Sequence, residues 1–86
     1  MNIYRLECFK DNYKKLDENI KKAVKTKLLL MAENPFHPSL RTKKVQGTQG
    51  IFEASINMRY RMTWEYYRDG ILLRNIGEHD ETLKNP

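Results

Sequence analysis

Apolar and polar residues alternate along the stretch from Gly50 to Gly77 in a pattern that predicts three consecutive antiparallel strands. The apolar positions are Phe52, Ala54 and Ile56 in the first strand and Tyr60, Met62, Trp64 and Tyr66 in the second. Alternation with period two places apolar side chains on one face and polar side chains on the other. The turn dipeptide Asp69-Gly70 precedes a third, largely apolar strand. We therefore expect a β-meander with one face in the core.

The polar face of this meander gathers side chains that can do chemistry. Glu53 and Ser55 of the first strand would lie beside Arg61 and Thr63 of the second. If solvent reaches this face, the four side chains could converge on one ligand. The alternative is an ordinary solvated sheet face with cross-strand ion pairs. The pattern alone leaves both interpretations open.

The N-terminal segment from Ile3 to Phe9 also alternates and predicts a strand. The residues expected to face inward are Tyr4, Leu6 and Cys8. Cys8 is the only cysteine, which excludes an internal disulfide and a cysteine-based metal cluster. We expect it to serve as a small core residue of this strand.

From Phe9 onward the apolar period becomes helical. The stripe consists of Phe9, Tyr13, Leu16, Ile20, Val24, Leu28 and Met31, at steps of three and four. Asp17 can cap a new helix, so we expect a short helix to Leu16 and a longer one to about Glu33. Asn34-Pro35 would end the second helix. Its lysine-rich face, which includes Lys22 and Lys27, could follow a phosphate backbone but is more typical of a solvated helix surface.

The segment from Asn34 to Gly50 contains two prolines and two glycines and predicts a connecting loop. Its basic cluster of Arg41, Lys43 and Lys44 could place cations at the rim of the polar sheet face, where phosphates would be held.

Composition restricts the function further. The 86 residues predict a single domain, 1–86, and 16 basic against 11 acidic residues give a net charge of +5, which favours an anionic partner such as nucleic acid or an acidic protein. No apolar run is long enough to cross a membrane and no signal peptide is recognisable, so we expect a cytoplasmic protein. No glycine-rich phosphate loop or metal-ligand spacing occurs, so we expect no cofactor and no metal.

The last ten residues place His79-Asp80 at the end of the third strand, after Gly77, which would let the backbone turn. A histidine there suits general acid or base chemistry because its unperturbed pKa lies near neutral pH. A lone histidine is also often only structural, and the pattern does not decide between the two.

The order of strand, two helices, basic loop and three-stranded meander resembles the RelE/ParE superfamily of small bacterial toxins over essentially the whole chain, most of all the RelE and YafQ type. The segments that carry the resemblance are AENPFHPSLRTKKVQGTQG, IFEASIN, RYRMTWEY and LRNIGEHDETLKNP. The resemblance implies an α+β fold in which the helices cover one face of a single sheet. It also implies the toxin of a type II toxin–antitoxin system, which acts as a metal-independent endoribonuclease on mRNA at the ribosome. Such a toxin is neutralised by an acidic antitoxin encoded beside it and does not bind DNA by itself.

The resemblance assigns roles to single residues. Arg61 matches the arginine that stabilises charge at the scissile phosphate, and His79 stands where YafQ-like members have a catalytic histidine. His79 would then protonate the leaving 5′ oxygen or help activate the 2′-hydroxyl. Glu53 and Ser55 stand where RelE has two lysines, so here only Glu53 could accept a proton.

Further cations would hold flanking phosphates under the same resemblance, namely Arg59, Arg74 and the pair Lys43-Lys44. The facing of Arg74 is ambiguous, because both alternating sets of residues between Ile71 and Ile76 are largely apolar. RelE carries an aromatic residue in its C-terminal tail that has no counterpart after His79, so base stacking would come from elsewhere.

Two other functions fit the same sequence. One is a ParE-like toxin that binds a protein target such as gyrase without cutting RNA. The other is a non-catalytic RNA-binding domain, which the missing lysines and tail aromatic would explain. The combination of Glu53, Arg61 and His79 favours the nuclease.

Overall fold

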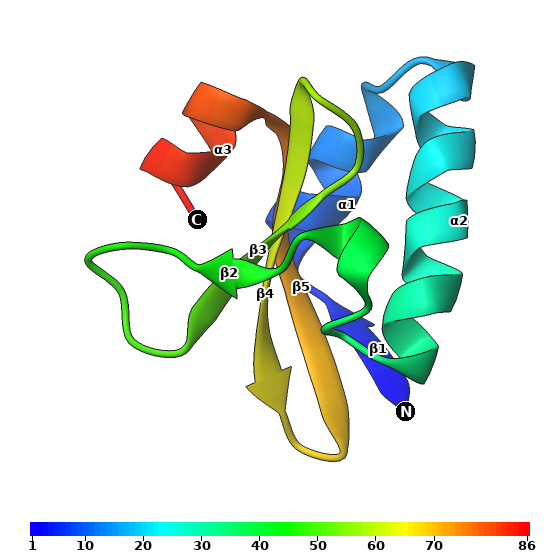
Figure 1. Cartoon of the computed structure of the whole chain (residues 1–86). Helices are drawn as coiled ribbons and strands as arrows, with labels where there is room; N and C mark the ends of the chain where they lie inside the picture. Colours follow the sequence, from blue (N-terminus) through cyan, green and yellow to red (C-terminus); the bar gives the residue numbers. More distant parts are fainter.

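A mixed five-stranded sheet in the order β1-β5-β4-β3-β2 forms the middle of the structure (Figure 1). The computed structural model describes all residues, 1–86. The elements are β1 (Asn2–Arg5), α1 (Glu7–Lys14), α2 (Glu18–Glu33), the 3-10 turn η1 (Pro38–Leu40), β2 (Lys43–Lys44), β3 (Ile51–Ser55), β4 (Tyr60–Tyr67), β5 (Gly70–Glu78) and α3 (His79–Lys84). β1 runs parallel to β5, and all other neighbours are antiparallel. The predicted α+β order is confirmed, with β2 and α3 as additions.

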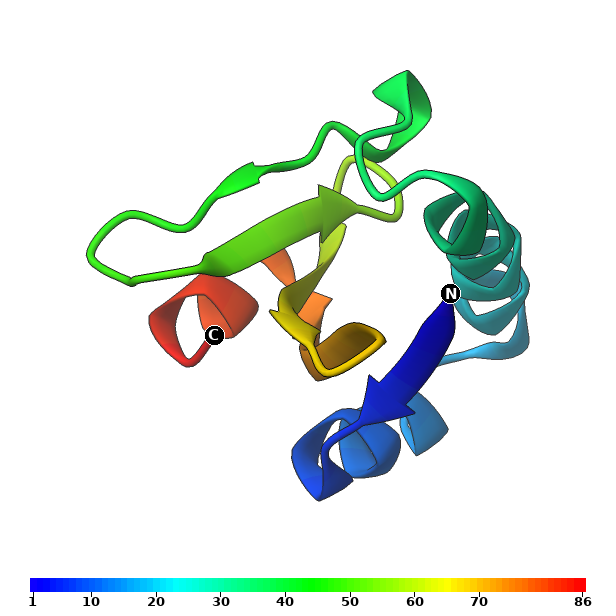
Figure 2. The same cartoon turned by 90° about the horizontal axis from the view of Figure 1, so that it is seen from below.

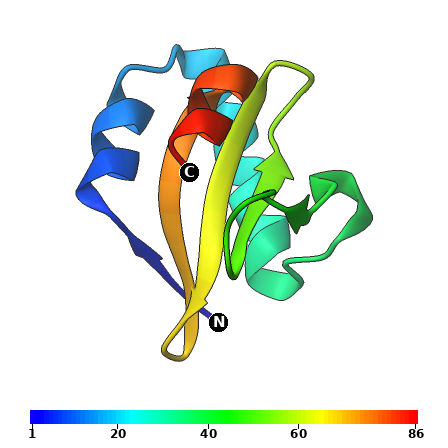
Figure 3. The same ribbon diagram turned by 90° about the vertical axis from the view of Figure 1, so that its left-hand side faces the viewer.

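The helices cover both faces of the sheet. α2 lies on one face and the short α3 on the other, as Figures 2 and 3 show from two directions. α1 follows β1 directly and lies beside the last part of β5, which β1 is too short to reach. The core between α2 and the sheet consists of Phe9, Val24, Met31, Leu40, Ala54, Ile56, Met62, Trp64, Ile71, Leu73 and Ile76. None of the helices combines the length and the apolar composition that crossing a bilayer requires.

The helical stripe and its interruption are confirmed. Phe9, Val24 and Met31 are buried, and the other members of the stripe pack against the core. The backbone N–H of Ile20 donates to Asp17 Oδ1 over 3.0 Å, which caps α2 as predicted. The helix ends at Glu33, immediately before Asn34-Pro35.

The predicted strand from Ile3 to Phe9 is wrong in its second half. β1 ends at Arg5 and α1 begins at Glu7, so Leu6 and Cys8 are exposed. Ile3, rather than Leu6 or Cys8, packs against the core. The error arises because Phe9 fits both an alternating and a helical pattern, and a short stretch of alternation cannot decide between them.

The meander is confirmed, and a β-bulge explains its third strand. Thr63 pairs with Asn75 whereas the next residue, Trp64, pairs with Leu73, so Arg74 is an extra residue on β5. The bulge reverses the alternation, and Leu73 and Ile76 therefore both face the core despite their odd spacing. This reversal is the reason that both alternating sets of β5 looked apolar.

Two glycines predicted to form turns instead lie in β5. The β4–β5 turn is Arg68-Asp69, with Arg68 at a φ of 50°, and Gly70 already pairs with Asn2. A Cβ on Gly70 would lie 1.8 Å from the Asn2 carbonyl oxygen, so glycine lets β1 approach. A Cβ on Gly77 would lie 2.9 Å from Thr82 Oγ1. Gly77 therefore makes room for α3 and does not form a turn.

Candidate active site

A row of polar residues crosses four strands on the sheet face that carries α3. Lys43 on β2 lies opposite Glu53, Glu53 opposite Thr63, and Thr63 opposite Asn75. Glu53, Thr63 and Asn75 are buried, and α3 packs against β4 and β5, the strands that carry Thr63 and Asn75. The prediction that Glu53, Ser55, Arg61 and Thr63 are neighbours is confirmed, since Ser55 also lies opposite Arg61. The face is not an open solvated surface, because its centre is buried and only its rim is accessible.

Glu53 and Arg61 form an ion pair at this rim. Arg61 Nε lies 3.7 Å from Glu53 Oε1, and the exposed fractions of the two side chains are 17% and 6%. Arg61 Nη1 donates to the carbonyl oxygens of Asn57, at 2.6 Å, and Tyr60, at 3.0 Å. These bonds fix the guanidinium and leave Nη2 free of hydrogen bonds. Arg61 can therefore donate to a ligand without reorganising.

His79 is the first residue of α3 and is fixed by its backbone and by its ring. Its backbone N–H donates to the Arg59 carbonyl oxygen over 2.9 Å. Its Nδ1 lies 2.9 Å from Asp80 Oδ1, and this hydrogen bond lowers the pKa of the Asp80 carboxyl group. An ionised carboxylate only accepts hydrogen bonds, so Nδ1 carries the proton and Nε2 is left to exchange a proton with a ligand.

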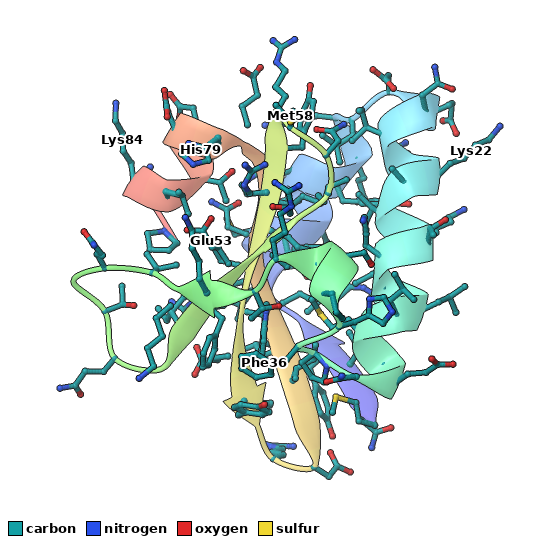
Figure 4. The ribbon with its side chains drawn as sticks, viewed as in Figure 1. Lys22, Phe36, Glu53, Met58, His79 and Lys84 are labelled. Carbon is teal, nitrogen blue, oxygen red and sulfur yellow. The ribbon has the colours of Figure 1, made fainter.

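One cleft brings Glu53 and His79 together with two lysines. β2 contributes Lys43 and Lys44, β3 contributes Glu53, and α3 contributes His79 and Leu83. Figure 4 shows Glu53 and His79 in the region between β2 and α3. We refer to this space as the His79 cleft. Neither lysine forms an ion pair, so the cleft combines two uncompensated cations with one carboxylate and one imidazole.

The other predicted residues lie outside this cleft. Arg61 lines a neighbouring cleft together with Arg41, and the ion pair with Glu53 joins the two spaces. The Arg59 guanidinium donates to Glu78 over 3.1 Å. Arg74 is paired with Glu65 and donates from Nε to the Pro86 carbonyl oxygen over 3.1 Å. Arg59 and Arg74 are thus already engaged by carboxylates.

The chemistry available in the His79 cleft is proton transfer beside positive charge. A carboxylate can accept a proton, an imidazole can donate one, and the cations can stabilise negative charge that develops between them. No group of three or more His, Cys, Asp or Glu side chains could hold a metal ion. The sequence did not indicate that α3 would close one side of this cleft, or that β2 would place Lys43 opposite Glu53.

No protein-family model and no curated protein matches the sequence. Solved structures do match. A YoeB/ParE toxin from Agrobacterium tumefaciens is similar with a TM-score of 0.79 and 13% identity, over 92% of this chain and 99% of that one. The E. coli DinJ-YafQ complex contains a chain that is similar with a TM-score of 0.68 and 17% identity, over 93% of this chain and 94% of that one. The intact E. coli RelBE toxin–antitoxin complex contains a chain that is similar with a TM-score of 0.72 and 16% identity, over 91% of this chain and 95% of that one.

These likenesses extend over nearly the whole of each compared chain, and their TM-scores are well above those of unrelated folds. At identities of 13–17% they establish a common architecture. The chain therefore has the fold of the RelE/ParE toxins, and the resemblance noted in the sequence is confirmed at the level of the fold.

Proposed function

We propose that this protein is the toxin of a type II toxin–antitoxin pair and that it cleaves mRNA by attack of a 2′-hydroxyl on the adjacent phosphate. The observation that carries the proposal is the His79 cleft, in which a carboxylate, an imidazole and two unpaired lysines line one space. The fold supports the toxin role, because the similar solved structures are toxins.

The proposed reaction assigns one proton transfer to each of two residues. Glu53 accepts the proton of the 2′-hydroxyl through Oε2, since Oε1 faces Arg61. The 2′ oxygen then bonds to phosphorus as the bond from phosphorus to the 5′ oxygen breaks. His79, protonated at Nε2, donates its proton to the leaving oxygen. The products are a 2′,3′-cyclic phosphate and a 5′-hydroxyl.

Lysines on β2 would supply the positive charge that RelE carries on the strand corresponding to β3. The two RelE lysines are replaced by Glu53 and Ser55, which removes positive charge from β3. Lys43 lies directly opposite Glu53 on the next strand, and Lys44 lines the same cleft. We infer that these two lysines, with Arg61, stabilise the additional negative charge of the pentavalent transition state.

The product termini provide the test. The purified protein is incubated with ribosomes that carry a defined mRNA, and the termini are mapped. We expect cuts at defined positions that leave a 2′,3′-cyclic phosphate. A 2′-deoxy substitution of the nucleotide just before a cut should abolish cleavage at that phosphate, because the attacking hydroxyl is then missing. Cleavage that survives this substitution would overturn the mechanism. RNA binding without products would favour the non-catalytic domain, and inhibition of gyrase without RNA binding would favour the ParE-like function.

The proposed partner is an acidic antitoxin, because the chain carries a net charge of +5 and has a small core. We expect co-expression with an adjacent acidic reading frame to yield a complex and to relieve growth arrest in the cytoplasm. A complex that leaves growth arrested would contradict neutralisation, and the absence of a complex would contradict the partnership.

A further inference from the structure

A second cleft, on the other side of the Glu53–Arg61 pair, holds three cations from three elements. Lys27 comes from α2, Arg41 follows η1, and Arg61 comes from β4. Ser55, the last residue of β3, Asn57 in the turn that follows it, and Ser39 of η1 add polar groups to the lining. We refer to this space as the Arg61 cleft. Glu53 is the only carboxylate paired with any of the three cations, so the cleft has an excess of positive charge.

Lys27 differs from the other lysines of α2. Its Nζ donates to the Ser39 carbonyl oxygen over 3.0 Å, which holds the ammonium group at the cleft. Lys22 is exposed and points away from the domain (Figure 4), and Lys21 is paired with Glu18. The ammonium group of Lys27 retains two free N–H donors. Because it is already held in place, less side-chain entropy is lost when it binds an anion.

Arg41 is held in a conformation that is unfavourable for its residue type. Its φ of 49° and ψ of 45° lie in the left-handed region, which glycine adopts readily and arginine does not. Its side chain is exposed and has no ion-pair partner. Strained backbone of this kind is concentrated at functional sites. Here the strain coincides with an arginine that lines a cationic cleft.

The neutral groups of the cleft also offer donors. Asn57 Oδ1 accepts the backbone N–H groups of Arg59 and Tyr60, both over 2.9 Å, so its NH₂ group is left to donate. Ser55 contributes a hydroxyl. Arginine, lysine, amide and hydroxyl donors around an excess of positive charge are the groups that contact phosphate oxygens.

We propose that the Arg61 cleft binds a backbone phosphate of single-stranded RNA next to the scissile phosphate. This inference rests on the proposed function, which places the scissile phosphate between Arg61 and the His79 cleft. The RNA strand then runs from Lys27 and Arg41, past the Glu53–Arg61 pair, to the lysines of β2. Lys27 is the residue that this path adds to the cations predicted from the sequence.

Salt-dependent binding tests the subsite without cleavage. The probe is a single-stranded RNA oligonucleotide with 2′-O-methyl groups, which cannot undergo 2′-hydroxyl attack. In a plot of the logarithm of the binding constant against the logarithm of the salt concentration, one phosphate contact contributes a slope of magnitude about 0.7. This slope makes the contact worth roughly fivefold more in affinity at 0.1 M salt than at 1 M salt. Lys27→Gln should therefore weaken binding by roughly fivefold at 0.1 M salt and reduce the slope by about 0.7. The matched control Lys22→Gln removes the same charge from the solvated face of α2 and should change neither quantity.

Arg41→Gly provides the second variant. It removes the guanidinium and relieves the left-handed strain, so the Tm should not fall while RNA affinity does. If Lys27→Gln and Arg41→Gly both bind like Lys22→Gln, or if the parent protein does not bind the oligonucleotide, the subsite is wrong. Parent binding that depends on both residues, without cleavage of unmodified mRNA, would support the subsite and refute the nuclease. Cleavage by the parent together with unchanged binding by both variants would support the nuclease and refute the subsite.

Discussion

Glu53 Oε1 and Arg61 Nε lie 3.7 Å apart in the wall between the two clefts, and both side chains are largely withdrawn from water. This pair gives each residue a structural function besides its proposed chemistry. Arg61 compensates the charge of a buried carboxylate, and Glu53 helps to hold the guanidinium against the sheet. Substitution of either residue therefore affects stability as well as activity.

Arg61→Ala should lower the free energy of unfolding by about 1–3 kcal/mol, because it leaves Glu53 buried without a counter-charge. Adding Glu53→Gln to Arg61→Ala removes the uncompensated charge and should recover part of this loss. Urea unfolding of the parent, both single variants and the double variant measures the coupling. Strictly additive effects would mean that the two side chains do not interact energetically.

Gly77→Ala should destabilise the docking of α3. The new Cβ would lie 2.9 Å from Thr82 Oγ1, and Thr82 is buried. Overpacking of this kind typically costs about 1–3 kcal/mol. We expect a lower Tm, faster amide exchange in α3 and reduced cleavage, because His79 begins this helix. Thr82→Ala removes the clashing oxygen, so the double variant should regain part of the loss. A Gly77→Ala protein with parental Tm and exchange rates would contradict the close packing of α3 on β5.

The β4–β5 turn should contribute stability that disappears in acid. Tyr4 Oη and Asn2 Nδ2 each donate to Asp69 over 2.6 Å, and these bonds lower the pKa of the Asp69 carboxyl group. A group whose folded pKa lies below its unfolded value stabilises the fold above the unfolded pKa and loses this effect as pH falls through the folded pKa. Asp69→Asn should therefore destabilise the protein at pH 7, and the difference from the parent should shrink below about pH 4. A difference that stays constant between pH 7 and pH 3 would show that the two bonds do not depend on charge.

The elements that the sequence predicts well are those fixed by neighbouring residues. The apolar stripe and the Asp17 cap locate α2, and the alternation of β3 and β4 identifies the core face. The bulge at Arg74 depends on which residues of β4 pair with which residues of β5. Alternation within a single strand does not reveal this pairing, so the sequence does not predict the bulge. α3 has six residues and one large apolar side chain, Leu83, so it has too few apolar positions to show a period.

The same limit applies to the candidate site. Glu53 and Arg61 are identifiable because their strands are, and register then places them together. The sequence predicts a loop at Lys43, and only the structure shows that β2 places this lysine opposite Glu53. Lys27 and Lys22 look alike in sequence, and only the contact of Lys27 with the Ser39 carbonyl oxygen distinguishes them. Contacts between elements distant in sequence therefore decide which of the many basic residues belong to a cleft.

In the proposed reaction His79 transfers a proton to the leaving oxygen, and His79→Gln removes the group that carries it. The ring is 45% exposed and its hydrogen-bond partner Asp80 lies at the surface, so the Tm should remain close to that of the parent. Lys84→Gln is the matched control, because it alters the same short helix at a side chain that points away from the cleft (Figure 4).

The measurement is the single-turnover rate of mRNA cleavage on programmed ribosomes by the parent, His79→Gln and Lys84→Gln, each with its Tm. We expect His79→Gln to lower the rate by roughly 10²–10⁴-fold, the contribution of a positioned proton donor, and Lys84→Gln to cleave like the parent. A folded His79→Gln protein that cuts mRNA at the parental rate would show that His79 does not transfer a proton in the reaction.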